Sequence, residues 1–159
     1  MAHPVRLRIL SLLTGAALTA AEVARELELT HANASYHLRN LLAAGLIVPA
    51  GEERIRGGVA KRYRYDPDRA RGKPVQTPDD NRALYAAVAD ELIRRTAEAD
   101  WAGPKTMTDA ELWVDPEVWV DVRDRIAELS RELHAAARPP RTPGTVRTAT
   151  TIAMFRLAP

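Results

Sequence analysis

The stretch THANASYHLRNLLAAGLI, residues 30–47, decides the fold. Thr30 can cap a helix, because its hydroxyl can accept a hydrogen bond from a free N–H of the first turn. Apolar residues then recur every three or four positions on one side, at Ala34, Leu38 and Leu41. Gly45 ends the pattern, and β-branched residues begin at Ile47. We expect a helix over Thr30–Leu42 followed by a strand.

Two short helices are predicted before this stretch. Pro4 suits the first position of a helix that Gly15 ends. The run Thr19-Ala20-Ala21-Glu22 is typical of a capping box, in which Thr19 and Glu22 each accept a backbone hydrogen bond, and the helix that it starts stops near Leu29. Only about three residues then separate the second and third helices, which is the spacing of a helix-turn-helix.

Two strand-like runs follow, Ile47 to Ile55 and Ala60 to Tyr65, and Gly57-Gly58 between them permits a tight hairpin. The hairpin is rich in basic residues: Arg54, Arg56, Lys61, Arg62 and Arg64. Alternate residues of a strand share a face, so Arg54 is expected beside Arg56, and Arg62 beside Arg64. Such a hairpin after a helix-turn-helix predicts a wing.

The back half predicts two long helices, Pro78 to Ala99 and Pro116 to Ala137, and two strands, Met107 to Val114 and Thr145 to Leu157. The predicted fold class is mainly α with small β (α+β). It comprises a winged helix-turn-helix over residues 1–66, a basic linker over 67–76, and a helical dimerisation and effector region with a few strands over 77–159.

The outward side of the third helix carries groups that bind nucleic acid. Asparagine can pair with adenine, arginine with guanine or phosphate, and hydroxyls with phosphate. No acidic residue lies between Thr30 and Gly51, and Glu52 and Glu53 are expected to face away from DNA. The candidate DNA-binding residues are Thr30, His31, Asn33, Ser35, Tyr36, His37, Arg39, Asn40, Arg54, Arg56, Lys61 and Arg62.

Charge supports this interpretation. Residues 1–73 hold 12 Lys and Arg against 7 Asp and Glu, a net charge of +5, whereas residues 74–159 hold 11 against 14, a net charge of −3. The front half can therefore face phosphates. The absence of cysteine excludes disulfides and thiolate metal sites. No long apolar run or leader pattern is present, so we expect a cytoplasmic protein without a membrane span.

Four segments, in order, resemble the ArsR-type winged-helix regulators: His3-Pro4-Val5-Arg6-Leu7-Arg8-Ile9-Leu10, Ser35-Tyr36-His37-Leu38-Arg39-Asn40-Leu41, Ala44-Gly45-Leu46-Ile47 and the basic hairpin. The resemblance covers roughly Met1 to Tyr65. It implies a homodimeric repressor or activator that binds a pseudo-palindrome in double-stranded DNA, with the helix from Thr30 as recognition helix. Many relatives sense metals through cysteines or Asp/His sets, but this chain has no cysteine and no histidine over Pro78–Ala99, so no metal and no cofactor is expected.

Several alternatives remain open at this stage. His37 is equally compatible with phosphate contact and with helix packing, and Tyr36 either meets DNA or packs under the wing. His134 follows Glu128 and Glu132, yet an exposed helix face explains these three better than a metal site. Large side chains of the back half could line a pocket for a small apolar effector, or form core or dimer interface: Tyr85, Trp101, Met107, Trp113, Trp119 and Phe155.

The rival functions are a winged helix used for protein contact and a small-molecule-binding protein built on the back half. No nucleophile–base set, glycine-rich phosphate loop or metal signature is present, so the sequence predicts no enzyme.

Overall fold

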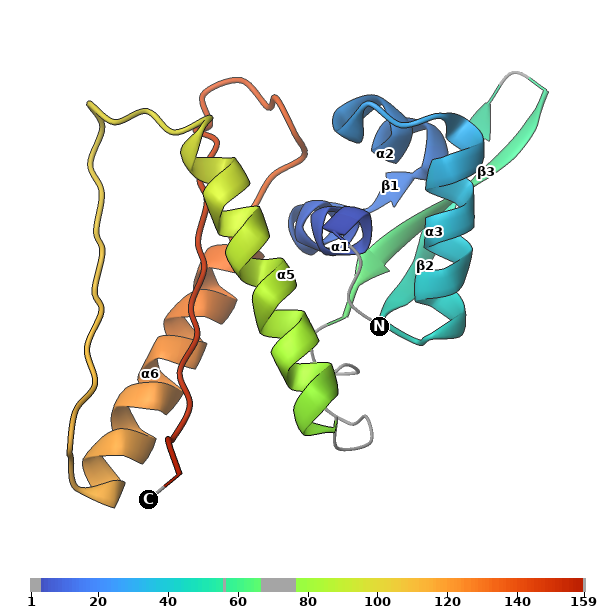
Figure 1. Ribbon diagram of the computed structural model, residues 1–159. Coiled ribbons are helices and arrows are strands. Elements are labelled where there is room, and N and C mark those ends of the chain that lie inside the picture. Colours follow the sequence, from blue (N-terminus) through green and yellow to red (C-terminus); the bar gives the residue numbers. More distant parts are fainter. Residues whose placement is uncertain (1–3, 56, 67–76, 159) are drawn as a thin grey trace.

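The computed structural model describes residues 4–55, 57–66 and 77–158 (Figure 1). Its helices and strands, in chain order, are α1 (Pro4–Gly15), β1 (Leu18–Thr19), α2 (Ala20–Leu27), α3 (His31–Ala43), β2 (Ile47–Ile55), β3 (Gly58–Tyr65), α5 (Pro78–Thr96) and α6 (Pro116–Ala135). The α+β winged helix-turn-helix that the sequence predicted is confirmed. The predicted linker, residues 67–76, lies outside the described residues.

The helix-turn-helix has the local geometry that its capping residues dictate. The Thr19 hydroxyl accepts a hydrogen bond from Glu22 N at 3.2 Å, and the Glu22 carboxylate accepts one from Thr19 N at 2.8 Å, so the capping box is complete. Glu28 ends α2 in the left-handed region, with φ of 56°. Thr30 then caps α3 by accepting a hydrogen bond from Asn33 N at 3.2 Å. These contacts fix the turn between the two helices.

One hydrophobic core lies beneath α1, α2 and α3. Its fully buried residues come from all three helices and the start of β2: Ile9, Leu13, Val23, Ala34, Leu38, Leu41 and Ile47. Tyr63 and Tyr65 of β3 pack against its edge. The burial of one side of α3 leaves its opposite side facing outward.

The sheet has three antiparallel strands in the order β1-β3-β2. β2 and β3 form the hairpin that the sequence predicted, with an irregularity in β2 between Pro49 and Glu52. The two-residue strand β1 was not predicted, because two residues are too few for a recognisable alternation. It pairs Leu18 with Tyr63 and so holds the base of the hairpin against the helices.

The back half packs on the helix-turn-helix through α1. Helix α5 passes across α1 and contacts it, and α6 makes a smaller contact with α1 (Figure 1). At Gly15 this approach is close, since a Cβ atom there would lie 3.2 Å from the Cβ of Ala137. Arg141 also forms an ion pair with Glu26 of α2 at 3.5 Å.

The two strands predicted in the back half do not form in a single copy of the chain, so both predictions are wrong for the monomer. Residues 104–115, here called the strap, and residues 145–158, the C-terminal segment, contain no regular secondary structure. Both have β-type sequences, but neither forms a backbone hydrogen bond ladder with any described residue. A strand needs a neighbour, and the described part of a single copy supplies none to either segment.

Candidate nucleic-acid interface

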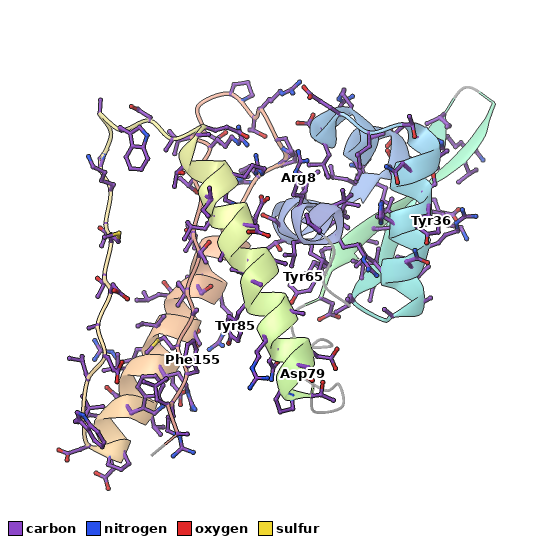
Figure 2. All side chains as sticks on the ribbon, in the orientation of Figure 1. Arg8, Tyr36, Tyr65, Asp79, Tyr85 and Phe155 are labelled. Carbon is purple, nitrogen blue, oxygen red and sulfur yellow. The ribbon has the colours of Figure 1, made fainter. Side chains whose placement is uncertain are left out.

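The open side of α3 carries most of the residues predicted to bind DNA. His31, Asn33, Tyr36 and Arg39 are exposed, and Ser35 and Asn40 are half-buried. Tyr36 is 55% exposed and points away from the body of the domain (Figure 2). An α-helix presented in this way is narrow enough for the major groove.

The exposed residues form two stripes. His31, Ser35 and Arg39 follow one another at four-residue intervals and line a hollow of about 320 Å³ together with Ala20 and Tyr63. Asn33 and Tyr36 form the neighbouring stripe, at the crest of the helix. The hollow adjoins the crest and extends to Ala20, the first residue of α2, whose N-terminus is already capped by Thr19 and Glu22.

His37 belongs to the packed side of α3. Only 6% of the residue is exposed, and its ring meets the ring of Tyr36 edge-on, with centroids 5.3 Å apart. A buried ring cannot reach a phosphate, so the DNA contact predicted for His37 is wrong. Of the two alternatives that the sequence left open, helix packing holds.

The two faces of the hairpin have different charges. β3 runs without irregularity, so Lys61 shares a face with Tyr63, whose ring lines the hollow beside α3. Glu52 lies directly opposite Lys61, and Arg54 is one alternation further along β2 on the same face. Lys61 and Arg54 thus project on the side of the recognition helix. Glu52 lies on this side too, which corrects the expectation that it would face away.

Arg62 has a structural position on the other face. Its guanidinium donates two hydrogen bonds to the carbonyl oxygen of Ala17, at 2.7 and 3.1 Å, and forms ion pairs with Glu53 and with Glu22, the latter at 3.3 Å. These contacts tie the hairpin to the segment before α2. They replace the phosphate contact that we predicted for Arg62, because its donors are already engaged within the chain.

The other basic residues of the hairpin are exposed where the structure describes them, namely Arg54, Lys61 and Arg64. Arg64 shares the face of Arg62, away from α3. The predicted contact Arg56 lies outside the described residues.

Glu22 gives the domain a dependence on pH. Burial raises the pKa of its carboxyl, but the hydrogen bonds from Thr19 and the nearby Arg62 outweigh burial and hold the pKa below its ordinary value. A depressed pKa stabilises the fold at pH values above that of an ordinary glutamate, about 4.3, and this contribution is lost as the pH falls through the lower pKa of the folded state.

The substitution Glu22→Gln tests this contribution, since glutamine keeps the acceptor of the capping box and removes the charge. At neutral pH the variant is expected to unfold with a free energy lower by about 1 kcal/mol. The difference from the wild type should shrink as the pH falls below about 4. Denaturant titrations between pH 2 and 7 measure it, and a difference that stays constant over this range contradicts the role of the charge.

The aromatic residues of the back half do not assemble an effector pocket in the described chain. Trp101, Met107 and Trp113 are exposed, and Tyr85 and Phe155 contact each other at the surface, with ring centroids 5.4 Å apart (Figure 2). A hollow of about 720 Å³ runs along α6, and five of the seven residues that line it are charged, whereas none of the large aromatic residues is among them. Of the two alternatives for these side chains, the exposure favours an interface. Among the described residues no group of histidine, aspartate and glutamate is placed to hold a metal ion.

Fold and interface together define a class, that of DNA-binding helix-turn-helix regulators. Residues 1–49 match the family model of a helix-turn-helix domain, within the part of the chain that resembles ArsR-type regulators. The chain is also similar to the crystal structure of a possible transcriptional regulator for arsenical resistance, with 29% sequence identity over 61% of this chain and 88% of that chain, and a TM-score of 0.38. No curated protein matches the chain significantly. Within the described ranges, none of the helices combines the length and the apolar character that crossing a bilayer requires.

Proposed function

We propose that the protein is a sequence-specific transcriptional regulator of the ArsR type that binds double-stranded DNA as a homodimer and represses transcription by occupying its operator. The observation that carries the proposal is the open face of α3, where Asn33, Tyr36 and Arg39 stand together beside the basic hairpin. No acidic residue of α3 opposes the approach of a phosphate backbone.

In the proposed complex, the position of each side chain determines which part of the DNA it contacts. Asn33 and Arg39 offer the paired donors and acceptors that distinguish bases in the major groove, and Tyr36 at the crest contacts the adjoining sugar or phosphate. His31 and Ser35 line the hollow beside α3, where their side chains can bind a backbone phosphate. Lys61 and Arg54 of the hairpin grip the flanking backbone.

A dimer accounts for the exposed helices of the back half. Helix α6 buries none of its 20 residues, although valine and leucine side chains recur along it. A two-fold axis through this region places two copies of α3 about one helical turn of DNA apart, so the operator should be a pseudo-palindrome.

Selection of bound duplexes from a random pool tests the proposal directly. The full chain should enrich one sequence whose two half-sites are related by inversion, with centres about 10 base pairs apart. A pool that shows no enrichment after repeated rounds, although the chain still binds DNA, contradicts sequence-specific regulation.

The neighbours Lys61 and Arg62 make a matched pair for the role of the hairpin. Lys61→Ala should weaken binding to all duplexes and lower the slope of log K against log salt by about 0.9, the value for one lost phosphate contact. Its thermal stability should remain that of the wild type, because the side chain is exposed.

Arg62→Ala should do the reverse, because its donors hold Ala17, Glu22 and Glu53. We expect a loss of about 1–3 kcal/mol in unfolding free energy and an unchanged salt slope under conditions in which the variant is folded. A salt slope that falls for Arg62→Ala and not for Lys61→Ala would reverse the assignment of the two faces.

A further inference from the structure

The chain exposes far more surface than a folded monomer of its size. Its accessible surface is 12355 Å², whereas a compact monomer of 17.6 kDa exposes about 7,900 Å². The surplus of roughly 4,400 Å² exceeds what each partner of a stable obligate dimer buries, since such interfaces cover about 2,000–5,000 Å² in total over both partners. A surplus of this size is what a partner with a large contact area would cover.

The surplus is concentrated in the back half. Exposed apolar residues recur along α5 and α6, at Leu92, Ile93, Val118, Val122, Leu129 and Leu133. In the strap, Met107 is 92% and Trp113 is 97% exposed. The C-terminal segment adds Val146, Ile152 and Leu157. Large apolar side chains exposed in this number are typical of an interaction site.

The strap and the C-terminal segment also carry unused backbone groups. From residue 104 to 114 and from 146 to 158, neither segment forms a backbone–backbone hydrogen bond with another described residue. The C-terminal segment is held by Arg95 of α5, which donates a hydrogen bond to the carbonyl oxygen of Thr150, and by the ion pair of Arg147 with Glu98, just after α5. Extended chain with free N–H and C=O groups is a template for strand addition.

We propose that a second copy of this chain completes both segments: the strap of each copy pairs as a β-strand with the C-terminal segment of the other, and the exchanged strands cover the apolar faces of α5 and α6. The inference rests on the proposed function and deepens it, because it says how the homodimer is built. Each copy alone lacks the strand partners, so the back half is complete only in the dimer.

Charge selects this pairing over the pairing of like segments. The strap has three acids and one base, Asp109, Glu111, Asp115 and Lys105, a net charge of −2. The C-terminal segment has two bases and no acid, Arg156 and Arg147, of which Arg147 also pairs with Glu98. Opposite charges across a strand pair are favourable and like charges directly opposite are not. Two straps would repel each other, whereas a strap and a C-terminal segment would attract each other.

The position of the two segments favours exchange over pairing within one copy. In Figure 1 the strap descends along the outer edge of the molecule, with α6 between it and the C-terminal segment. No backbone hydrogen bond joins the two segments in the described chain. The edge of the strap that faces away from α6 is therefore the one that we expect a second copy to pair with.

Hydrogen exchange on the full chain, with sedimentation equilibrium on the same sample, tests the inference. In the dimer, about every second amide of residues 106–114 and 147–156 should exchange at least about 100-fold more slowly than in an unstructured peptide. Fast exchange throughout both segments in a proven dimer would overturn it, and so would slow exchange in a chain that sediments as a monomer.

Proline variants supply the control. In an extended strand successive N–H groups point to opposite sides, so one of Ala110→Pro and Glu111→Pro should remove an intermolecular hydrogen bond, raise the dimer dissociation constant at least tenfold and release the protected amides of the C-terminal segment. Ala110→Ser keeps the N–H and should leave both unchanged. If both proline variants dimerise like the wild type, the strands are not exchanged.

A gel shift on the selected operator separates this inference from the proposed function. A dimer that binds the operator with unprotected segments would refute strand exchange and leave the regulator intact. Protected segments in a dimer that does not discriminate between duplexes would support strand exchange and refute the sequence-specific regulator.

Discussion

Replacement of Leu41 by alanine is expected to lower the free energy of unfolding by about 2–5 kcal/mol. The side chain is 1% exposed and lies at the centre of the core formed by α1, α2 and α3. Truncation removes three carbon atoms from contact with their neighbours and leaves a cavity that close-packed surroundings fill only in part. Denaturant titration, with the change in midpoint converted at constant slope, gives the loss.

The next residue provides a matched control. Leu42 is on the same helix and 36% exposed, so Leu42→Ala is the same chemical change at a surface position. Its cost should be below about 1 kcal/mol. Equal losses at Leu41 and Leu42 would mean that α3 is not packed through the side assigned here, and that its DNA-facing side is wrong as well.

Arg39→Ala should reduce the preference of the protein for its operator over random duplex by about 1–3 kcal/mol, which is roughly 5- to 150-fold. The reason is that an arginine on the open face of α3 can satisfy two acceptors of one guanine, and alanine leaves those acceptors without a partner. The ratio of the two dissociation constants, measured at one salt concentration, is the readout.

Arg64→Ala controls for the loss of a positive charge. Arg64 is exposed on the face of the hairpin that points away from α3, so its removal should change both dissociation constants together and keep their ratio. Asn33→Ala, also on the open face, should lower the ratio in the manner of Arg39→Ala. If the ratio is unchanged in the Arg39 and Asn33 variants alike, α3 does not read bases.

The front half could be predicted almost residue by residue. Capping residues and periodic apolar residues act locally, so Thr19, Thr30 and the series Ala34, Leu38, Leu41 fixed the helices before any tertiary contact was known. Local rules also separated the packed side of α3 from its open side. They left the role of His37 undecided, because it lies at the boundary between the packed and the open side of α3, where burial depends on tertiary contacts.

The contacts of Arg62 could not be predicted from local sequence patterns. Strand alternation correctly put Arg62 on one face, but the carbonyl oxygen of Ala17 and the carboxylate of Glu22 are 45 and 40 residues away in the sequence. Nothing in the hairpin itself indicates that these groups occupy its guanidinium. The strands predicted for the back half were wrong for a related reason: a β-type sequence specifies an extended chain, whereas a strand also requires a partner.

The close approach of Gly15 to Ala137 has a consequence for how the two halves communicate. A Cβ atom at Gly15, the last residue of α1, would lie 3.2 Å from the Cβ of Ala137 just after α6, closer than ordinary van der Waals contact, and α5 contacts α1 as well. A change in the angle between two copies in the back half would therefore move both reading helices apart or together as rigid bodies. In the proposed dimer, the affinity for an operator of fixed spacing would then depend on contacts that lie far from any base pair.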